Sequence, residues 1–108
     1  MHFSFAIYKD AKVFLTGGEN GAVVSFDLIS KSWRDEPPLY QDRYAHSSIT
    51  LSEKLYVIGG FESKGSIEFL NVNERQRWQI AFIGSQLTMR ASPAVAVTSE
   101  HTIAVFGG

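Results

Sequence analysis

The segment Lys54-Leu-Tyr-Val-Ile-Gly-Gly60 recurs twice more in the chain, as Lys12-Val-Phe-Leu-Thr-Gly-Gly18 and as Thr102-Ile-Ala-Val-Phe-Gly-Gly108. The three Gly-Gly pairs are 42 and 48 residues apart. The apolar residues before each pair, rich in β-branched and aromatic types, are typical of a strand covered on both faces. A repeat of this length is typical of propellers and solenoids.

A second short apolar segment precedes each copy. Counting back from Gly-Gly without a gap aligns Ala6 with Ser48 and Ala96. Polar pairs separate the two segments in each copy: Lys9-Asp10, Ser52-Glu53 and Ser99-Glu100. The sequence therefore predicts three hairpins whose turns have the same length.

Two copies continue beyond Gly-Gly. The first continues with the turn Glu19-Asn20-Gly21, in which Asn-Gly favours a tight hairpin, and the second with a longer turn over 61–65. An apolar strand, a polar turn and a tryptophan follow in each case, Trp33 in the first copy and Trp78 in the second. About ten strands and no helix are expected, because no pattern of helical period occurs.

This order of elements resembles the kelch repeat, which in that family forms one four-stranded antiparallel blade of a β-propeller. The residues that carry the resemblance are Gly17, Gly18 and Trp33, then Gly59, Gly60 and Trp78, then Gly107 and Gly108. The resemblance implies an all-β fold, a partial kelch-type β-propeller built from four-stranded antiparallel blades. The expected blade limits are 2–38 for blade 1, 39–84 for blade 2 and 85–108 for the first half of blade 3.

The motif residues have structural explanations that do not depend on the family. Consecutive glycines permit backbone angles closed to other residues, and a large indole can cover one blade against the next. Arg43 and Arg90 resemble the arginine that often opens a kelch repeat. Leu70 departs from the family pattern, because the equivalent position usually carries an aromatic residue, as Phe26 does in the first copy.

Two and a half blades cannot close a ring, since closed propellers use about four to eight blades. Repeat units bury their faces only against their neighbours. We therefore expect further blades, from a longer chain or from other copies, to complete the structure.

The composition excludes several classes of partner and compartment. The 108 residues have a formal net charge of −1 and include no cysteine. No general attraction to nucleic acid follows from this balance, and no apolar run is long enough for a membrane helix. A protein without cysteine and without a signal-peptide pattern is expected in the cytoplasm.

No residue pattern indicates a reaction. The histidines, His2, His46 and His101, fall at non-equivalent places in the repeat and share no metal-ligand spacing. No Gly-x-Ser-x-Gly nucleophile elbow occurs, and Gly-Gly ends strands rather than opening a helix as a phosphate loop would. The sequence therefore predicts no catalytic residue, no metal site and no cofactor.

The residues of the expected loops between strands predict a binding surface. In an antiparallel blade the loops after the second and the fourth strand emerge on one face, which forms a rim. The candidate partner-binding residues on these loops are Glu19, Asn20, Tyr40, Arg43, Tyr44, Phe61, Glu62, Lys64 and Arg90. Aromatic residues and arginine dominate protein interfaces. Arg43 and Arg90 have an alternative structural role, in which they hold neighbouring blades together.

The favoured function is a non-catalytic protein–protein interaction module, because the kelch family commonly binds protein or peptide partners through that rim. Such a segment would serve as a scaffold or as the substrate-recognition part of an adaptor. One alternative is the propeller fragment of an enzyme whose catalytic residues lie outside this segment. A Trp-Asp propeller is disfavoured, because Arg34 and Gln79 follow the two tryptophans.

Overall fold

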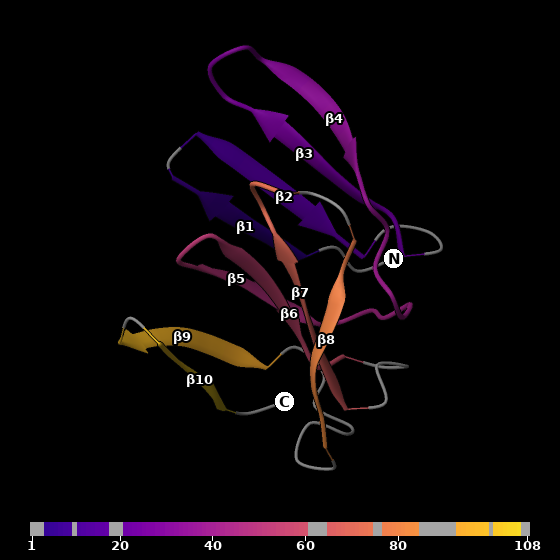
Figure 1. The fold of residues 1–108 in the computed structure, drawn as a ribbon, viewed down its shortest axis with the longest axis vertical. Coiled ribbons are helices and arrows are strands. Elements are labelled where there is room, and N and C mark those ends of the chain that lie inside the picture. The colour runs from indigo at the N-terminus through magenta and orange to yellow at the C-terminus, as the bar shows by residue number, and fades with distance from the viewer. Residues whose placement is uncertain are drawn as a thin grey trace.

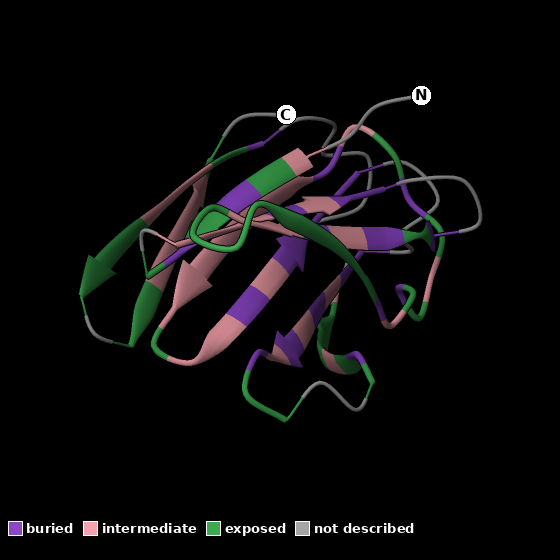
Figure 2. Ribbon diagram, turned by 90° about the horizontal axis from the view of Figure 1, so that it is seen from above, coloured by how far each residue is buried: buried purple, intermediate pink, exposed green. Residues whose placement is uncertain are grey.

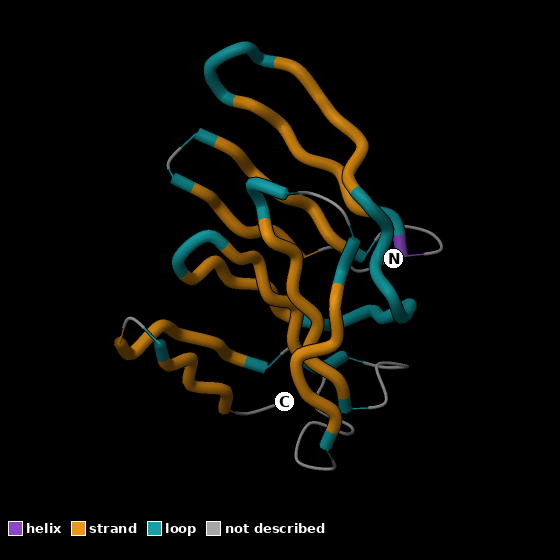
Figure 3. Tube along the Cα trace, in the orientation of Figure 1, coloured by secondary structure: helices purple, strands orange, loops and turns teal. Residues whose placement is uncertain are grey.

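The computed structural model describes residues 4–9, 11–17, 21–60, 65–74, 77–84, 93–99 and 101–106. They form ten strands: β1 (Ser4–Tyr8), β2 (Lys12–Thr16), β3 (Val23–Asp27), β4 (Ser32–Glu36), β5 (Ser47–Leu51), β6 (Lys54–Ile58), β7 (Ser66–Asn71), β8 (Gln79–Ile83), β9 (Ala94–Ser99) and β10 (Thr102–Phe106). Apart from a 3₁₀ turn at Gly21, this described part of the chain contains no helix (Figure 3). The prediction of an all-β fold is confirmed.

The strands form three antiparallel sheets in chain order. Two are four-stranded, β1-β2-β3-β4 and β5-β6-β7-β8, and the third pairs β9 with β10. We call them blade 1, blade 2 and half-blade 3. Their first strands lie side by side, β1 against β5 and β5 against β9, and the sheets fan outward from there (Figure 1). This arrangement confirms the prediction of a partial propeller with four-stranded antiparallel blades.

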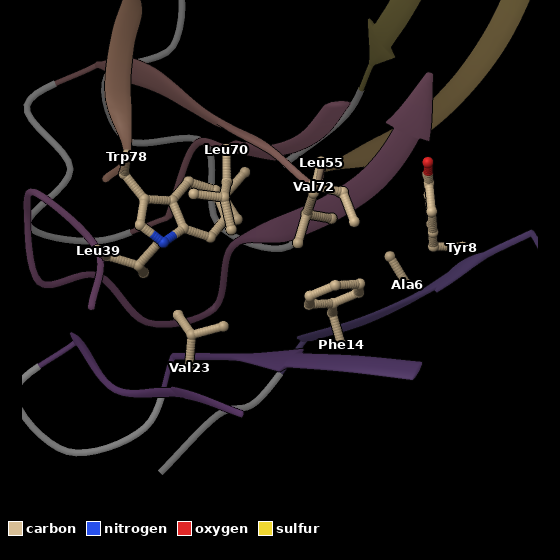
Figure 4. Close-up of a cluster of buried hydrophobic side chains, with 10 residues drawn as sticks. Ala6, Tyr8, Phe14, Val23, Leu39, Leu55, Leu70, Val72 and Trp78 are labelled. Carbon is tan, nitrogen blue, oxygen red and sulfur yellow. The ribbon is translucent and has the colours of Figure 1, made fainter. Parts of the chain in front are cut away.

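The main hydrophobic core lies between blade 1 and blade 2. Blade 1 contributes Phe14 and Val23, and blade 2 contributes Leu70 and Trp78 to the same cluster (Figure 4). Burial alternates along β7 between buried and half-buried residues (Figure 2). Every second side chain of this strand therefore points into the interface. The alternation is the expected result of a pleated strand between two neighbours. The core therefore belongs to the interface between blades rather than to either blade alone.

Hairpin lengths differ between the first two blades. Three residues separate Tyr8 from its strand partner Lys12, whereas two separate Leu51 from its partner Lys54. The predicted equality of these turns is wrong. The gap-free alignment of the repeats consequently fails by one residue in β5.

The one-residue slip changes which face a side chain occupies, because successive residues of a strand point to opposite faces. Ala6 pairs with Phe14 and belongs to the core shared with blade 2. Ser48 points the other way, toward blade 1, where its hydroxyl lies 2.7 Å from that of Ser4. Ile49, not Ser48, therefore occupies the place equivalent to Ala6.

Blade 1 exposes an apolar face on the side away from blade 2. Phe5, Ile7 and Trp33 all belong to this face, and Trp33 is 64% exposed. Trp78, the corresponding tryptophan of blade 2, is only 2% exposed, because blade 1 covers it. No element of the described residues covers the open face of blade 1 in the same way.

Candidate partner-binding rim

The linker between β4 and β5, residues 37–46, forms most of the described part of the predicted rim, together with Gly21 and Gly65 at the ends of the loops after Gly-Gly. Tyr40 and Tyr44 are 70% and 42% exposed, whereas Arg43 between them is 3% exposed. The other candidate contact residues, Glu19, Asn20, Phe61, Glu62, Lys64 and Arg90, lie outside the described residues, as do Gly18, Gly107 and Gly108. The structure thus brings the two tyrosines to the surface of one linker and turns Arg43 inward.

Arg43 is anchored inside blade 2 by four hydrogen bonds. Its Nη1 donates to the carbonyl oxygens of Gly59 and Ser66 at 3.2 and 2.8 Å. Its Nη2 donates to Ser66 Oγ at 2.6 Å and to Glu68 Oε2 at 2.7 Å. Burial lowers the pKa of the Arg43 guanidinium, and the charge of Glu68 acts in the opposite direction. These contacts give Arg43 a structural role within blade 2, rather than the expected role of holding neighbouring blades together.

Glu68 completes this network and fastens the linker to β7. Its Oε1 accepts from the backbone N–H of Tyr40 at 2.6 Å, and its Oε2 accepts from that of Gln41 at 2.9 Å. Both members of the Arg43–Glu68 ion pair have fully buried side chains. Glu68 is not among the site residues predicted from the sequence. Its one signal was a carboxylate inside the apolar run Ser66-Ile-Glu-Phe-Leu70, where a buried charge requires a partner.

Gly60 allows the linker to pass close to the end of β6. Its φ is +87°, and a Cβ atom at this position would lie 2.7 Å from the carbonyl oxygen of Tyr44. Gly17 and Gly59 also have positive φ, 94° and 71°. A side chain at Gly60 would both strain the backbone and collide with the linker. This geometry supports a structural role for Gly60.

His46 ends the linker in a buried position against blade 1. Its Nε2 lies 2.7 Å from Thr16 Oγ1. Since the Thr16 hydroxyl donates to the Ser4 carbonyl oxygen at 3.3 Å, it is the acceptor for a His46 Nε2–H donor. Burial and then the charge of Arg43 lower the pKa of His46 to about 4. The neutral imidazole is therefore the form that the fold accommodates.

The stability of the chain is expected to fall as the pH drops from about 6.5 to about 4, because the unfolded chain then binds a proton at His46 that the folded chain excludes. The loss due to this residue is about 3 kcal/mol at the acid end of the range. Urea unfolding across this pH range measures it. His46→Gln, whose amide can still donate to Thr16, should remove that part of the slope, with His101→Gln at an exposed histidine as matched control. Parallel profiles for the wild-type protein and His46→Gln would contradict the assignment.

In the part of the chain that the structure describes, no group of three histidine or carboxylate side chains is placed to hold a metal ion. Among these residues, no helix is long and apolar enough to cross a membrane.

Comparison with known proteins finds relatives but no matching family model. An F-box/kelch-repeat protein of Arabidopsis thaliana is 26% identical over 103 residues, which are 90% of this chain and 27% of that protein. Kelch-like protein 25 of Xenopus laevis is 31% identical over 111 residues, and that of Homo sapiens is 29% identical over 114. Each of these two matches covers 90% of this chain and 19% of the relative. The chain thus spans less than a third of the length of these proteins.

Proposed function

Because the chain carries kelch repeats, we propose that it is a non-catalytic protein–protein interaction module, a scaffold or substrate-recognition segment that binds a protein or peptide partner. The binding surface in this proposal is the rim formed by the loops after Gly-Gly and by the linkers between blades. The names of the relatives, F-box/kelch-repeat and Kelch-like, support the proposal.

The observation that carries the proposal is the pair of exposed tyrosines on the rim linker. Tyr40 and Tyr44 present aromatic surface to solvent, while partly buried hydrogen bonds to Glu68 hold the backbone of Tyr40 and Gln41 in place. Tyrosine is enriched among the residues that dominate binding energy at interfaces. A surface whose backbone is already ordered loses less conformational entropy when it binds.

The double variant Tyr40→Ala/Tyr44→Ala should lose partners that the wild-type chain captures in a comparative crosslinking and mass-spectrometry experiment. The expected loss of affinity is at least tenfold, since truncation of a hot-spot tyrosine costs about 2 kcal/mol. Ile29→Ser is the matched control, because Ile29 is an exposed apolar residue in the turn at the other end of β3 and β4 (Figure 1). Both variants should keep the wild-type melting temperature. Equal capture by all three proteins would overturn the proposal.

We also propose that further blades, from a longer chain or from other copies, cover the open faces. The exposed face of blade 1 supports this, since the equivalent surface of blade 2 is buried against its neighbour. At the opposite end of the structure, a cavity of about 230 Å³ lies between blade 2 and β10. Its lining includes Tyr56, Ile67, Ile103 and Val105, and this partly open apolar surface also supports coverage by further strands. The stability costs of Trp33→Ala and Trp78→Ala, compared in this chain and in longer chains, test this proposal.

A further inference from the structure

In the linker between β4 and β5, residues that bond to blade 2 alternate with residues that are exposed to solvent. Gln41 and Arg43 point into blade 2, where the Gln41 side-chain oxygen accepts from Ser66 Oγ at 2.7 Å. Tyr40, Asp42 and Tyr44 are the exposed residues between and beside them. We call these three the linker surface. Because hydrogen bonds to blade 2 hold the anchored residues, the backbone that carries the linker surface is ordered before any partner arrives.

The linker surface carries a negative charge that the described part of the chain leaves unneutralised. Asp42 makes no hydrogen bond and no ion pair with any described residue. The neighbouring cation, Arg43, is already paired with Glu68 inside the blade. The exposed carboxylate of Glu53, in contrast, accepts from Asn73 at 2.6 Å and pairs with Lys9 at 3.3 Å.

The Asp42 carboxylate lies close to Gly21. A Cβ atom at Gly21 would lie 2.9 Å from Asp42 Oδ1, so glycine at this position leaves room for the carboxylate beside the start of β3. The backbone N–H of Leu39 donates to the Gly21 carbonyl at 2.9 Å and keeps the two segments together. Asp42 is therefore an exposed anion beside Gly21, with an aromatic residue two positions away on each side.

We propose that the linker surface binds an arginine side chain of the protein or peptide partner. A guanidinium forms paired hydrogen bonds with a carboxylate and stacks flat on a tyrosine ring. An ammonium group is attracted to both groups as a point charge, but it forms neither the paired hydrogen bonds nor the flat stack. A partner segment that presents arginine thus matches both the charge and the aromatic surface of the linker. This inference rests on the proposed function, because it names the chemistry of the partner at the same rim.

Panning a random peptide library displayed on phage against the whole chain tests the inference, with the selected peptides synthesised and titrated by calorimetry. Arginine should be enriched at one position of the selected peptides. Asp42→Asn should weaken their binding about tenfold, the loss expected for one charge-assisted contact. Asp35→Asn is the matched control, because Asp35 is an exposed carboxylate on β4 without a tyrosine on either side. Replacing the peptide arginine by lysine should also reduce the affinity.

The possible outcomes distinguish failure of the arginine assignment from failure of the proposed interaction at the rim. Peptides that need Tyr40 and Tyr44 but lack arginine, or bind Asp42→Asn as well as wild type, would overturn the arginine assignment and leave the interaction rim standing. Peptides whose binding depends on none of the three residues would overturn both. Arginine-bearing peptides that tolerate lysine without loss would contradict recognition of the guanidinium.

Discussion

Arg43→Ala is expected to destabilise the chain by about 3–5 kcal/mol, the usual cost of removing one partner from a buried ion pair. The substitution leaves the carboxylate of Glu68 buried without its cation and removes the donors to Gly59 and Ser66. Since small domains are stable by only about 5–15 kcal/mol, much of the population should be unfolded in mild denaturant.

Urea unfolding followed by circular dichroism measures this effect. Arg34→Ala is the matched control, because Arg34 is an exposed arginine on β4, and its loss should change the free energy of unfolding by about 0.5 kcal/mol or less. Removing both charges, in Arg43→Met/Glu68→Leu, should recover part of the stability. The recovery is incomplete because the backbone N–H groups of Tyr40 and Gln41 lose their acceptor. An unfolding midpoint of Arg43→Ala equal to that of wild type would contradict the structural role.

Much of the fold could be predicted because the repeat consists of residues with strong local preferences for strands or for turns. The Gly-Gly pairs and the apolar runs before them indicated ten strands in the order that the structure shows. The register of β5 could not be predicted in the same way, since a two-residue and a three-residue polar turn look alike in sequence. The blade limits at 2–38, 39–84 and 85–108 stay predictions.

The rim was harder to predict than the fold, because its geometry depends on contacts between distant positions. Arginine suits both a protein interface and a buried ion pair, so the sequence left two roles open for Arg43. The deciding partner, Glu68, lies 25 residues further along the chain and belongs to a strand rather than a loop. The exposure of Tyr40 and Tyr44 agrees with their loop position, while their contact with a partner stays a proposal.

The two tryptophans offer the sharpest comparison of a covered and an uncovered blade face. Trp78 donates from Nε1 to the Pro37 carbonyl oxygen at 2.8 Å and lies in the core cluster with Leu39 and Val23 (Figure 4). Trp33 holds the corresponding place in blade 1, where its one aromatic neighbour among the described residues is Phe26, at 4.8 Å between ring centroids. The same residue type thus occurs once with a neighbouring blade and once without.

Trp78→Ala should cost about 3–5 kcal/mol in this chain, as for other buried aromatic residues, whereas Trp33→Ala should cost about 1 kcal/mol or less. Urea unfolding of both variants measures the difference. A longer chain or an assembly that places a further blade on blade 1 would bury Trp33 and raise its cost to that of Trp78. Tryptophan emission of Trp78→Phe, which isolates Trp33, should shift to the blue in the same sample. If the cost of Trp33→Ala stays low and its emission stays red in every longer chain and every oligomer, the face is not one that a further blade covers. The apolar surface of blade 1 would then need another explanation.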